Sequence, residues 1–246
     1  MKTLLGKRAF VTGASRGIGA AVARRLASEG ADVAIGYEKS ATAADAIAKA
    51  IRSTGRNAVT VPMSAADPTS VKAAVDRAAA ELGGLDILVN NAGIFRTGSI
   101  ESASLADIDE TLSVNLRAVV VATQAALAYM SNGGRIINTG SNLATRVPGG
   151  GMTLYAASKA ALIGLTKGLA RDLGSRSITV NVIHPGSTDT DMNPADGEHA
   201  QFQLQRMAIP RYADPDELAA LYAFVASPQA RSINGAELTV DGAANA

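Results

Sequence analysis

Short apolar runs rich in valine and isoleucine alternate with alanine-rich segments, and this alternation constrains the fold more than any other feature of the chain. We expect strands at residues 8–11, 32–37, 57–61, 85–90, 135–138, 178–182 and 237–240. We expect helices at residues 19–29, 41–53, 69–82, 105–130, 153–173 and 214–226, because alanine favours helix. Strands and helices in alternation predict right-handed βαβ units, and strands that carry apolar residues on both faces predict a parallel sheet covered on both sides.

The fold class that follows is α/β, a Rossmann-type doubly wound parallel sheet of about seven strands with helices on both faces. No linker or shift of composition divides the 246 residues, so we expect one domain over residues 1–246. Residues 184–197 contain two prolines and two glycines and form an irregular connection longer than most. We interpret this connection as part of a substrate loop or lid at about residues 184–210.

Composition and charge exclude several classes of partner. Lysine and arginine number 23 and aspartate and glutamate 22, so no basic field is available to gather nucleic acid or anionic lipid. No apolar run is long enough to span a bilayer, and the N-terminus lacks the pattern of a signal peptide. Because the chain also has no cysteine, we expect a cytoplasmic protein.

A glycine-rich turn follows the first expected strand and opens directly into a helix. The turn contains Gly13, Ser15, Arg16, Gly17, Ile18 and Gly19 in a Gly-x-x-x-Gly-x-Gly pattern. Glycines let backbone N–H groups approach a pyrophosphate, and a helix N-terminus carries partial positive charge. The turn therefore predicts a dinucleotide site, although turns of this kind also serve plain packing.

The end of the second expected strand bears on which dinucleotide is bound. Tyr37 stands where an acidic residue would bind the ribose 2′-hydroxyl of NAD, while Arg16 and Lys39 could meet a 2′-phosphate. We therefore favour NADP, with NAD possible. Glu38 counts against this choice, and the alternative is that Arg16 and Lys39 are ordinary solvated charges.

Tyr155 and Lys159 are four residues apart, so a helix places them on one face. A tyrosine has an ordinary pKa near 10. Lowering that pKa by about three units, so that the side chain can act as an acid or base near pH 7, requires about 4 kcal/mol of stabilisation of the phenolate. An ammonium at about 4 Å supplies an interaction of that order at an effective dielectric constant of about 20. The two side chains are thus candidates for a catalytic pair.

Taken in order, these motifs resemble those of the short-chain dehydrogenase/reductases over essentially the whole chain. The resemblance rests on the turn at residues 12–19, on Asn90-Asn91-Ala92-Gly93, on Asn115, on Ser141 with Tyr155 and Lys159, and on Pro185-Gly186 with Thr190. It implies an enzyme that moves a hydride between a nicotinamide and a carbonyl carbon. It also implies that Asn91, Ala92, Gly93, Pro185, Gly186, Thr188 and Thr190 contact the cofactor.

The resemblance assigns a role to each catalytic candidate. Tyr155 would exchange a proton with the substrate oxygen, and Ser141 would hydrogen-bond the same oxygen. Lys159 would hold the nicotinamide ribose and lower the pKa of Tyr155, while Asn115 would keep a water of a proton relay in place. No metal is expected, since His184 and His199 are 15 residues apart and are interpreted as ordinary loop histidines.

Three positions depart from the family pattern. Ser64 replaces the usual aspartate that contacts the adenine amino group, which would reduce adenine affinity. The interval of 14 residues from Ser141 to Tyr155 is about one longer than usual, and three consecutive glycines at 149–151 can absorb it. Thr188 replaces a common aliphatic residue whose contact with the carboxamide is made by backbone and would survive.

Small residues line one face of the Tyr155 helix, namely Ala156, Ala160, Gly164 and Gly168. They allow another element to pack closely, either the chain's own sheet or a second copy. In the family this helix and the preceding one pair with their copies, so the resemblance implies a homo-oligomer, a dimer or a homotetramer.

Two functions from different classes remain open. The first is an NADPH-preferring oxidoreductase that acts on a small ketone or secondary alcohol, similar to 3-oxoacyl-carrier-protein reductases. The second is a nucleotide-binding regulatory protein with little turnover. Residues 189–197 and 207–209 support the second, because they resemble a bacterial family member associated with cyclic-di-GMP binding and biofilm dispersal.

Overall fold

Seven parallel strands form one sheet in the computed structural model, which describes residues 2–246. The strand order is β3-β2-β1-β4-β5-β6-β7, and each neighbouring pair is parallel. The strands are β1 (Arg8–Val11), β2 (Asp32–Tyr37), β3 (Ala58–Pro62), β4 (Leu85–Asn90), β5 (Met130–Thr139), β6 (Thr179–Pro185) and β7 (Glu237–Val240). This confirms the predicted doubly wound parallel sheet, with residues 237–240 at one edge.

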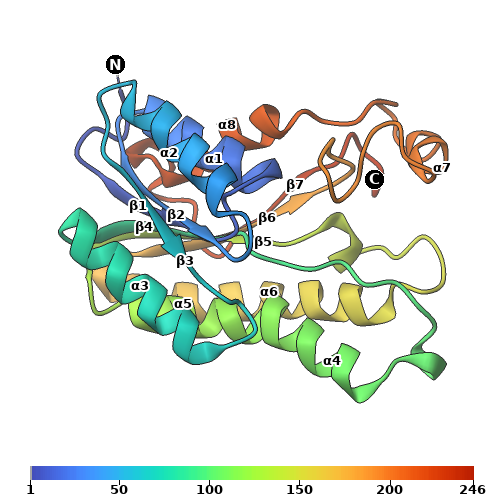
Figure 1. Ribbon diagram of the computed structural model, residues 1–246. Helices are drawn as coiled ribbons and strands as arrows, with labels where there is room; N and C mark the ends of the chain where they lie inside the picture. The colour runs from blue at the N-terminus through green and yellow to red at the C-terminus, as the bar shows by residue number, and fades with distance from the viewer. Residues whose placement is uncertain (1) are drawn as a thin grey trace.

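Helices cover both faces of the sheet (Figure 1). One face carries α1 (Gly17–Ser28), α2 (Ala41–Arg52) and α8 (Pro215–Ala226), and the other carries α3 (Pro68–Leu82), α4 (Leu105–Leu112), α5 (Ala118–Ala126) and α6 (Thr153–Asp172). A short helix, α7 (Ala200–Leu204), lies at the end of the sheet. Along residues 2–246, none of the helices is both long and apolar enough to cross a membrane.

The inner strands carry apolar residues at successive positions because the two cores lie on opposite faces of one sheet. In β1, Ala9 and Val11 join the core under α1 and α8, while Phe10 between them joins the core under α3 and α5. Successive side chains of a strand point to opposite faces, so a sheet covered on both sides leaves no place for polar alternation.

The structure corrects two predictions about local structure. The helix expected over residues 105–130 is divided into α4, a wider π-helical turn at Ser113–Arg117, and α5, which ends at Ala126. Met130 begins β5, because its backbone pairs with Leu85 and its side chain is buried in the core. His184, interpreted as a loop residue, lies in β6 and is only 1% exposed, because the strand continues to Pro185.

Candidate active site

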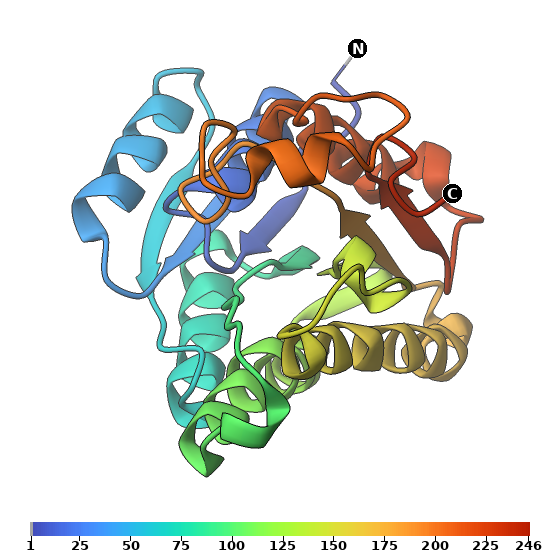
Figure 2. The same cartoon turned by 90° about the vertical axis from the view of Figure 1, so that its right-hand side faces the viewer.

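The loops that follow β1, β4, β5 and β6 lie at one end of the sheet, because the carboxyl ends of parallel strands point the same way. We call this the carboxyl edge of the sheet. This edge carries the glycine turn after β1, Asn91–Gly93 after β4, Ser141 after β5 and Gly186 after β6. Viewed from this end, the segment between β6 and α8 arches over the loops that follow β1 and β5 (Figure 2). The structure thus brings the predicted catalytic and cofactor segments together.

Hydrogen bonds between two loops fix the base of the site. The buried hydroxyl of Thr12 accepts from the backbone N–H groups of Asn91 and Ala92, both at 3.0 Å. In return the Asn91 amide donates to the carbonyls of Thr12 and Gly13, also at 3.0 Å. The loops after β1 and β4 are therefore held as one unit.

Thr12→Val is expected to destabilise this unit. The substitution keeps the side-chain shape but leaves two backbone N–H groups without an acceptor, which costs about 2 kcal/mol of unfolding free energy. Thr12→Ser retains the hydroxyl and serves as the control. Urea unfolding of both variants measures the effect, and equal stability for valine and wild type would contradict the assigned role of the hydroxyl.

The glycine turn packs closely against the loop after β4 and leaves the start of α1 uncapped. A Cβ on Gly13, whose φ is +63°, would lie 2.8 Å from the Cα of Ala92, and a Cβ on Gly19 would lie 2.4 Å from the Asn91 amide nitrogen. The first turn of α1 carries no acidic residue, and Arg16 at its N-cap makes no side-chain capping bond. The first N–H groups of α1 are thus available to an anion, unlike those of α3, which Asp67 caps.

Tyr155 and Lys159 lie one turn apart in α6. The Lys159 ammonium is 5.9 Å from the centre of the Tyr155 ring and donates to the carbonyl of Thr139 at 2.8 Å. Burial raises the pKa of Tyr155, and the hydroxyl of Ser141 offsets part of that rise. Burial also lowers the pKa of Lys159 to about 8, because it removes the ammonium from water, and no ion pair within residues 2–246 compensates its charge. Lys159 remains mostly protonated near neutral pH.

Asn115 connects the π-helical turn to the Tyr155 helix. Its side chain exchanges hydrogen bonds with the backbone of Ile94, at 2.9 and 3.0 Å, and donates to the Ser158 hydroxyl at 3.0 Å. Ser158 in turn donates to the carbonyl of Tyr155 at 2.7 Å. A Cβ on Gly93 would lie 3.3 Å from both the Asn115 oxygen and the Lys159 nitrogen, so these two polar atoms flank Gly93.

Ser141 lies just after the end of β5, which places it at the carboxyl end of the strands. Its hydroxyl caps a short 3₁₀ turn at Asn142–Ala144 by accepting from Leu143 N at 3.1 Å. Phe95, from the loop after β4, meets the Tyr155 ring edge to face, with centroids 4.7 Å apart. A polar hydroxyl and an apolar ring thus approach Tyr155 from different loops.

The residues expected near the ribose are exposed or only partly buried. Ser64 donates to the carboxylate of Glu38 at 3.3 Å. This hydrogen bond places the acidic side chain next to the residue that is expected to contact the adenine. Tyr37 packs partly against the core, and Lys39 is exposed. Arg16 lies 3.5 Å from Asp191, and both side chains are largely exposed, so the arginine can reorient towards an anion.

The segment after β6 contacts the glycine turn. A Cβ on Gly17 would lie 3.4 Å from the Thr190 methyl group, and one on Gly186 would lie 2.5 Å from the Cβ of Asp241. Thr188 is buried and bonds the carbonyl of Gly186 at 3.1 Å. Ser15, Arg16 and Gly17 line one open hollow together with Thr190 and Asp191.

The structural roles of three residues at this site were not identified from the sequence. The hydroxyl of Thr12, the bridging role of Ser158 and the buried position of His184 all depend on contacts between segments far apart in the chain. Thr12 alone carried a local signal, since it stands between β1 and the first glycine of the turn.

Comparisons with known proteins agree with this architecture. Residues 7–201 match the family model for short chain dehydrogenase. The chain is 42% identical to the cyclic-di-GMP-binding biofilm dispersal mediator protein of Escherichia coli over 99% of both chains. It is 38% identical to the 3-oxoacyl-[acyl-carrier-protein] reductase FabG of Staphylococcus aureus, over 96% of this chain and 97% of the relative.

A crystal structure of a short chain dehydrogenase from Burkholderia cenocepacia in complex with NADP has 65% sequence identity and a TM-score of 0.98, covering 99% of this chain and 100% of that one. The chain belongs to the short-chain dehydrogenase/reductase family.

Proposed function

We propose that the protein is an NADPH-preferring oxidoreductase that transfers a hydride between the nicotinamide and a ketone or secondary alcohol. The observation that carries this proposal is that Ser141, Tyr155 and Lys159 converge at the carboxyl end of the strands: the Ser141 hydroxyl lowers the raised pKa of Tyr155, and the Lys159 ammonium lies 5.9 Å from the centre of the Tyr155 ring. The uncapped start of α1 lies at the same end of the sheet. Family membership and the NADP complex of the Burkholderia protein support it.

Each catalytic candidate has a chemical task. When bound, the nicotinamide supplies or receives the hydride. Tyr155 gives its phenolic proton to the carbonyl oxygen during reduction and takes it back during oxidation. Ser141 donates a hydrogen bond to the same oxygen, and Lys159 stabilises the phenolate that remains. Asn115 and Ser158 hold the backbone at Tyr155 in place.

Cofactor binding is assigned to the residues that frame the sheet edge. The start of α1 would hold the pyrophosphate, and Arg16 with Lys39 would meet the 2′-phosphate. The full set is Gly13, Ser15, Arg16, Gly17, Ile18, Gly19, Tyr37, Lys39, Ser64, Asn91, Ala92, Gly93, Tyr155, Lys159, Pro185, Gly186, Thr188 and Thr190. A side chain at Gly13 or Gly19 would collide with the loop after β4, so these glycines hold the turn close to that loop. The uncapped start of α1 is the feature that supports a phosphate.

Arg16→Ala is expected to weaken NADPH binding by about 10- to 100-fold, because a charge-assisted contact with the 2′-phosphate is lost. NADH binding should change little, since NADH lacks that phosphate. Arg77→Ala, which removes an exposed arginine of α3 on the other face of the sheet, is the matched control for net charge. Fluorescence titration of the nicotinamide measures both affinities, and equal losses for NADPH and NADH would contradict this role of Arg16.

The substrate is proposed to carry an apolar group next to its carbonyl. Phe95 lies against Tyr155, and the segment at about residues 184–210 contributes the exposed Met192 and Phe202 as a lid. NADPH oxidation with a panel of aliphatic and aromatic ketones tests the function. Turnover that rises with the apolar size of the ketone supports it, and absence of turnover across the panel would refute it.

A second copy of the chain is the proposed partner. Gly164 and Gly168 of α6 face open space, since a Cβ on either meets nothing within 4 Å in residues 2–246. This disfavours the interpretation in which these two glycines serve packing on the chain's own sheet. The open face instead supports pairing of α6 with its copy in a dimer or tetramer.

A nucleotide-binding regulator is the second candidate function, and the 42% identity to the Escherichia coli mediator protein favours it. Titration with cyclic-di-GMP separates the two functions. Saturable binding that survives Tyr155→Phe, in a chain that turns over no ketone, would favour the regulator. NADPH-dependent turnover without such binding would favour the oxidoreductase.

A further inference from the structure

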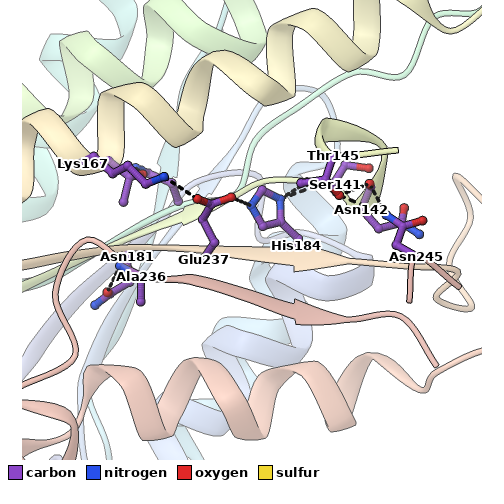
Figure 3. Close-up of polar contacts among 11 residues, drawn as sticks. Ser141, Asn142, Thr145, Lys167, Asn181, His184, Ala236, Glu237 and Asn245 are labelled. Carbon is purple, nitrogen blue, oxygen red and sulfur yellow. Dashed lines mark hydrogen bonds and ion pairs between the residues drawn. The ribbon is translucent and has the colours of Figure 1, made fainter. Parts of the chain in front are cut away.

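A buried histidine lies directly behind Ser141. His184 belongs to β6, is 1% exposed, and places its Nδ1 atom 3.1 Å from the backbone nitrogen of Ser141 and 2.8 Å from the carbonyl oxygen of the same residue (Figure 3). Neither the proposed hydride transfer nor cofactor binding uses this imidazole. Its contacts are with the backbone of the residue that carries the catalytic hydroxyl.

Two tautomers of the neutral imidazole fit this contact, and each satisfies a different backbone group of Ser141. The carbonyl of Ser141 already accepts from the N–H of Ala144 at 2.9 Å. Within residues 2–246, the N–H of Ser141 has His184 Nδ1 as its acceptor and no other. With the proton on Nδ1, the ring would donate to the Ser141 carbonyl at 2.8 Å and leave the buried Ser141 N–H without an acceptor. With the proton on Nε2, the Ser141 N–H is satisfied, and the buried Nε2–H faces Glu237 without a hydrogen bond in residues 2–246. We infer the second tautomer, because the carboxylate still attracts the Nε2–H.

The opposite side of the ring faces an acidic residue of the neighbouring strand. Nε2 lies 3.9 Å from one carboxylate oxygen of Glu237 in β7, and the other oxygen of Glu237 accepts from Lys167 of α6 at 2.7 Å. A carboxylate attracts an N–H and repels a lone pair, so Glu237 favours the same tautomer. Burial lowers the pKa of His184, which keeps the ring neutral near pH 7.

Gly140 gives independent evidence that the chain accommodates the imidazole here. A Cβ at Gly140 would lie 2.4 Å from His184 Nδ1 and 2.7 Å from its Cε1. Gly140 therefore has no side chain at the point where the imidazole of His184 approaches the backbone. Any larger residue would push the acceptor away from the Ser141 N–H.

We propose that His184 is a positioning residue for Ser141, which accepts the serine N–H and so fixes the backbone from which the catalytic hydroxyl points. Glu237, held by Lys167, sets the tautomer that makes this possible. The chain of contacts runs from the surface of α6 through β7 and β6 to the end of β5. The effect on turnover rests on the proposed oxidoreductase function, whereas the hydrogen bond itself does not.

Kinetics of three variants test the proposal. His184→Leu removes the acceptor and is expected to lower kcat by about 10- to 100-fold, the loss that a slightly misplaced catalytic group produces, with NADPH affinity unchanged. His184→Asn keeps an acceptor close to the position of Nδ1 and should recover most of the rate. Glu237→Gln should lower kcat by about two- to fivefold, as expected for loss of a partly exposed charge.

Glu81→Gln, which removes a carboxylate from the exposed Arg77 pair on α3, is the control for Glu237→Gln and should leave kcat unchanged. A leucine variant with wild-type kcat would overturn the proposal. So would an asparagine variant that is as slow as the leucine variant, because an acceptor alone would then give no rescue.

Imidazole nitrogen NMR of the native chain provides a readout that needs neither turnover nor a mutation. The chain has two histidines, and the exposed His199 is an internal reference. We expect the proton of His184 on Nε2 and a bare Nδ1; a proton on Nδ1 would refute the proposal even if His184→Leu does not fold. A chain with the expected tautomer but no ketone turnover would refute the proposed function and leave the His184–Ser141 contact intact.

Discussion

Tyr155→Phe is expected to lower kcat for ketone reduction by about a thousandfold, within the range that general acid catalysis contributes. The variant lacks the phenolic proton that Tyr155 is proposed to transfer, while the Lys159 ammonium stays near the ring. It keeps the ring, so the edge-to-face contact with Phe95 and the packing of α6 remain. Tyr155 is only one of the residues proposed to contact the cofactor, so NADPH affinity should fall far less than kcat.

Tyr129→Phe is the matched control for this experiment. The Tyr129 hydroxyl is exposed and bonds Asp76 at 3.0 Å, and the residue directly precedes the amino end of β5, so it lies at the opposite edge of the sheet from Ser141. Its loss should leave kcat unchanged. Steady-state NADPH oxidation measures both variants, and a Tyr155→Phe enzyme with wild-type turnover would exclude Tyr155 as the acid.

The strands were the most predictable part of the fold because they carry a purely local signal. Residues 8–11, 32–37, 85–90 and 237–240 were predicted to the residue, because each contains a short run rich in β-branched or other apolar side chains. The division of residues 105–130 was not predictable in this way. Met130 is as apolar as the helix before it, and only its pairing with Leu85 in the sheet assigns it to a strand.

The site was predictable where chemistry requires particular residue types at fixed spacing. Tyr155 and Lys159 share a helical face, and Ser141 follows a strand end, so their convergence follows from the topology. His184 was interpreted as a loop residue because Pro185 and Gly186 follow it, yet the strand continues to Pro185. Its contact with Ser141 depends on the register of β5 against β6, which a sequence without pairing information does not contain.

Lys159→Met is expected to lower kcat by about 100-fold near pH 7. An ammonium 5.9 Å from the Tyr155 ring favours the phenolate by about 3 kcal/mol at an effective dielectric constant of about 20, which corresponds to about two powers of ten in rate. Methionine keeps the length and the burial of the side chain. Lys49→Met, an exposed lysine in the last turn of α2, is the control.

The pH dependence of the activity lost in Lys159→Met tests whether the positive charge of Lys159 is the cause. The pKa of Lys159 is about 8, so the native side chain is protonated below that pH and becomes neutral above it. The ratio of wild-type to Lys159→Met activity should thus be constant below pH 8 and shrink as pH rises beyond it. A ratio that stays constant through pH 9 would contradict an electrostatic role for the ammonium.

The same substitution should make the protein more stable while it makes the enzyme slower. Lys159 is 4% exposed, and its pKa falls from 10.5 in the unfolded chain to about 8 in the folded one. Between these values the unfolded state binds more protons, so native stability rises with pH, by about 3 kcal/mol in all. Lys159→Met lacks this dependence and should exceed wild-type stability by about that amount at pH 7, with the difference shrinking from pH 8 to pH 10. Urea unfolding of both proteins across this range measures the difference, and a less stable methionine variant at pH 7 would show that the bond to Thr139 outweighs the cost of burying the charge.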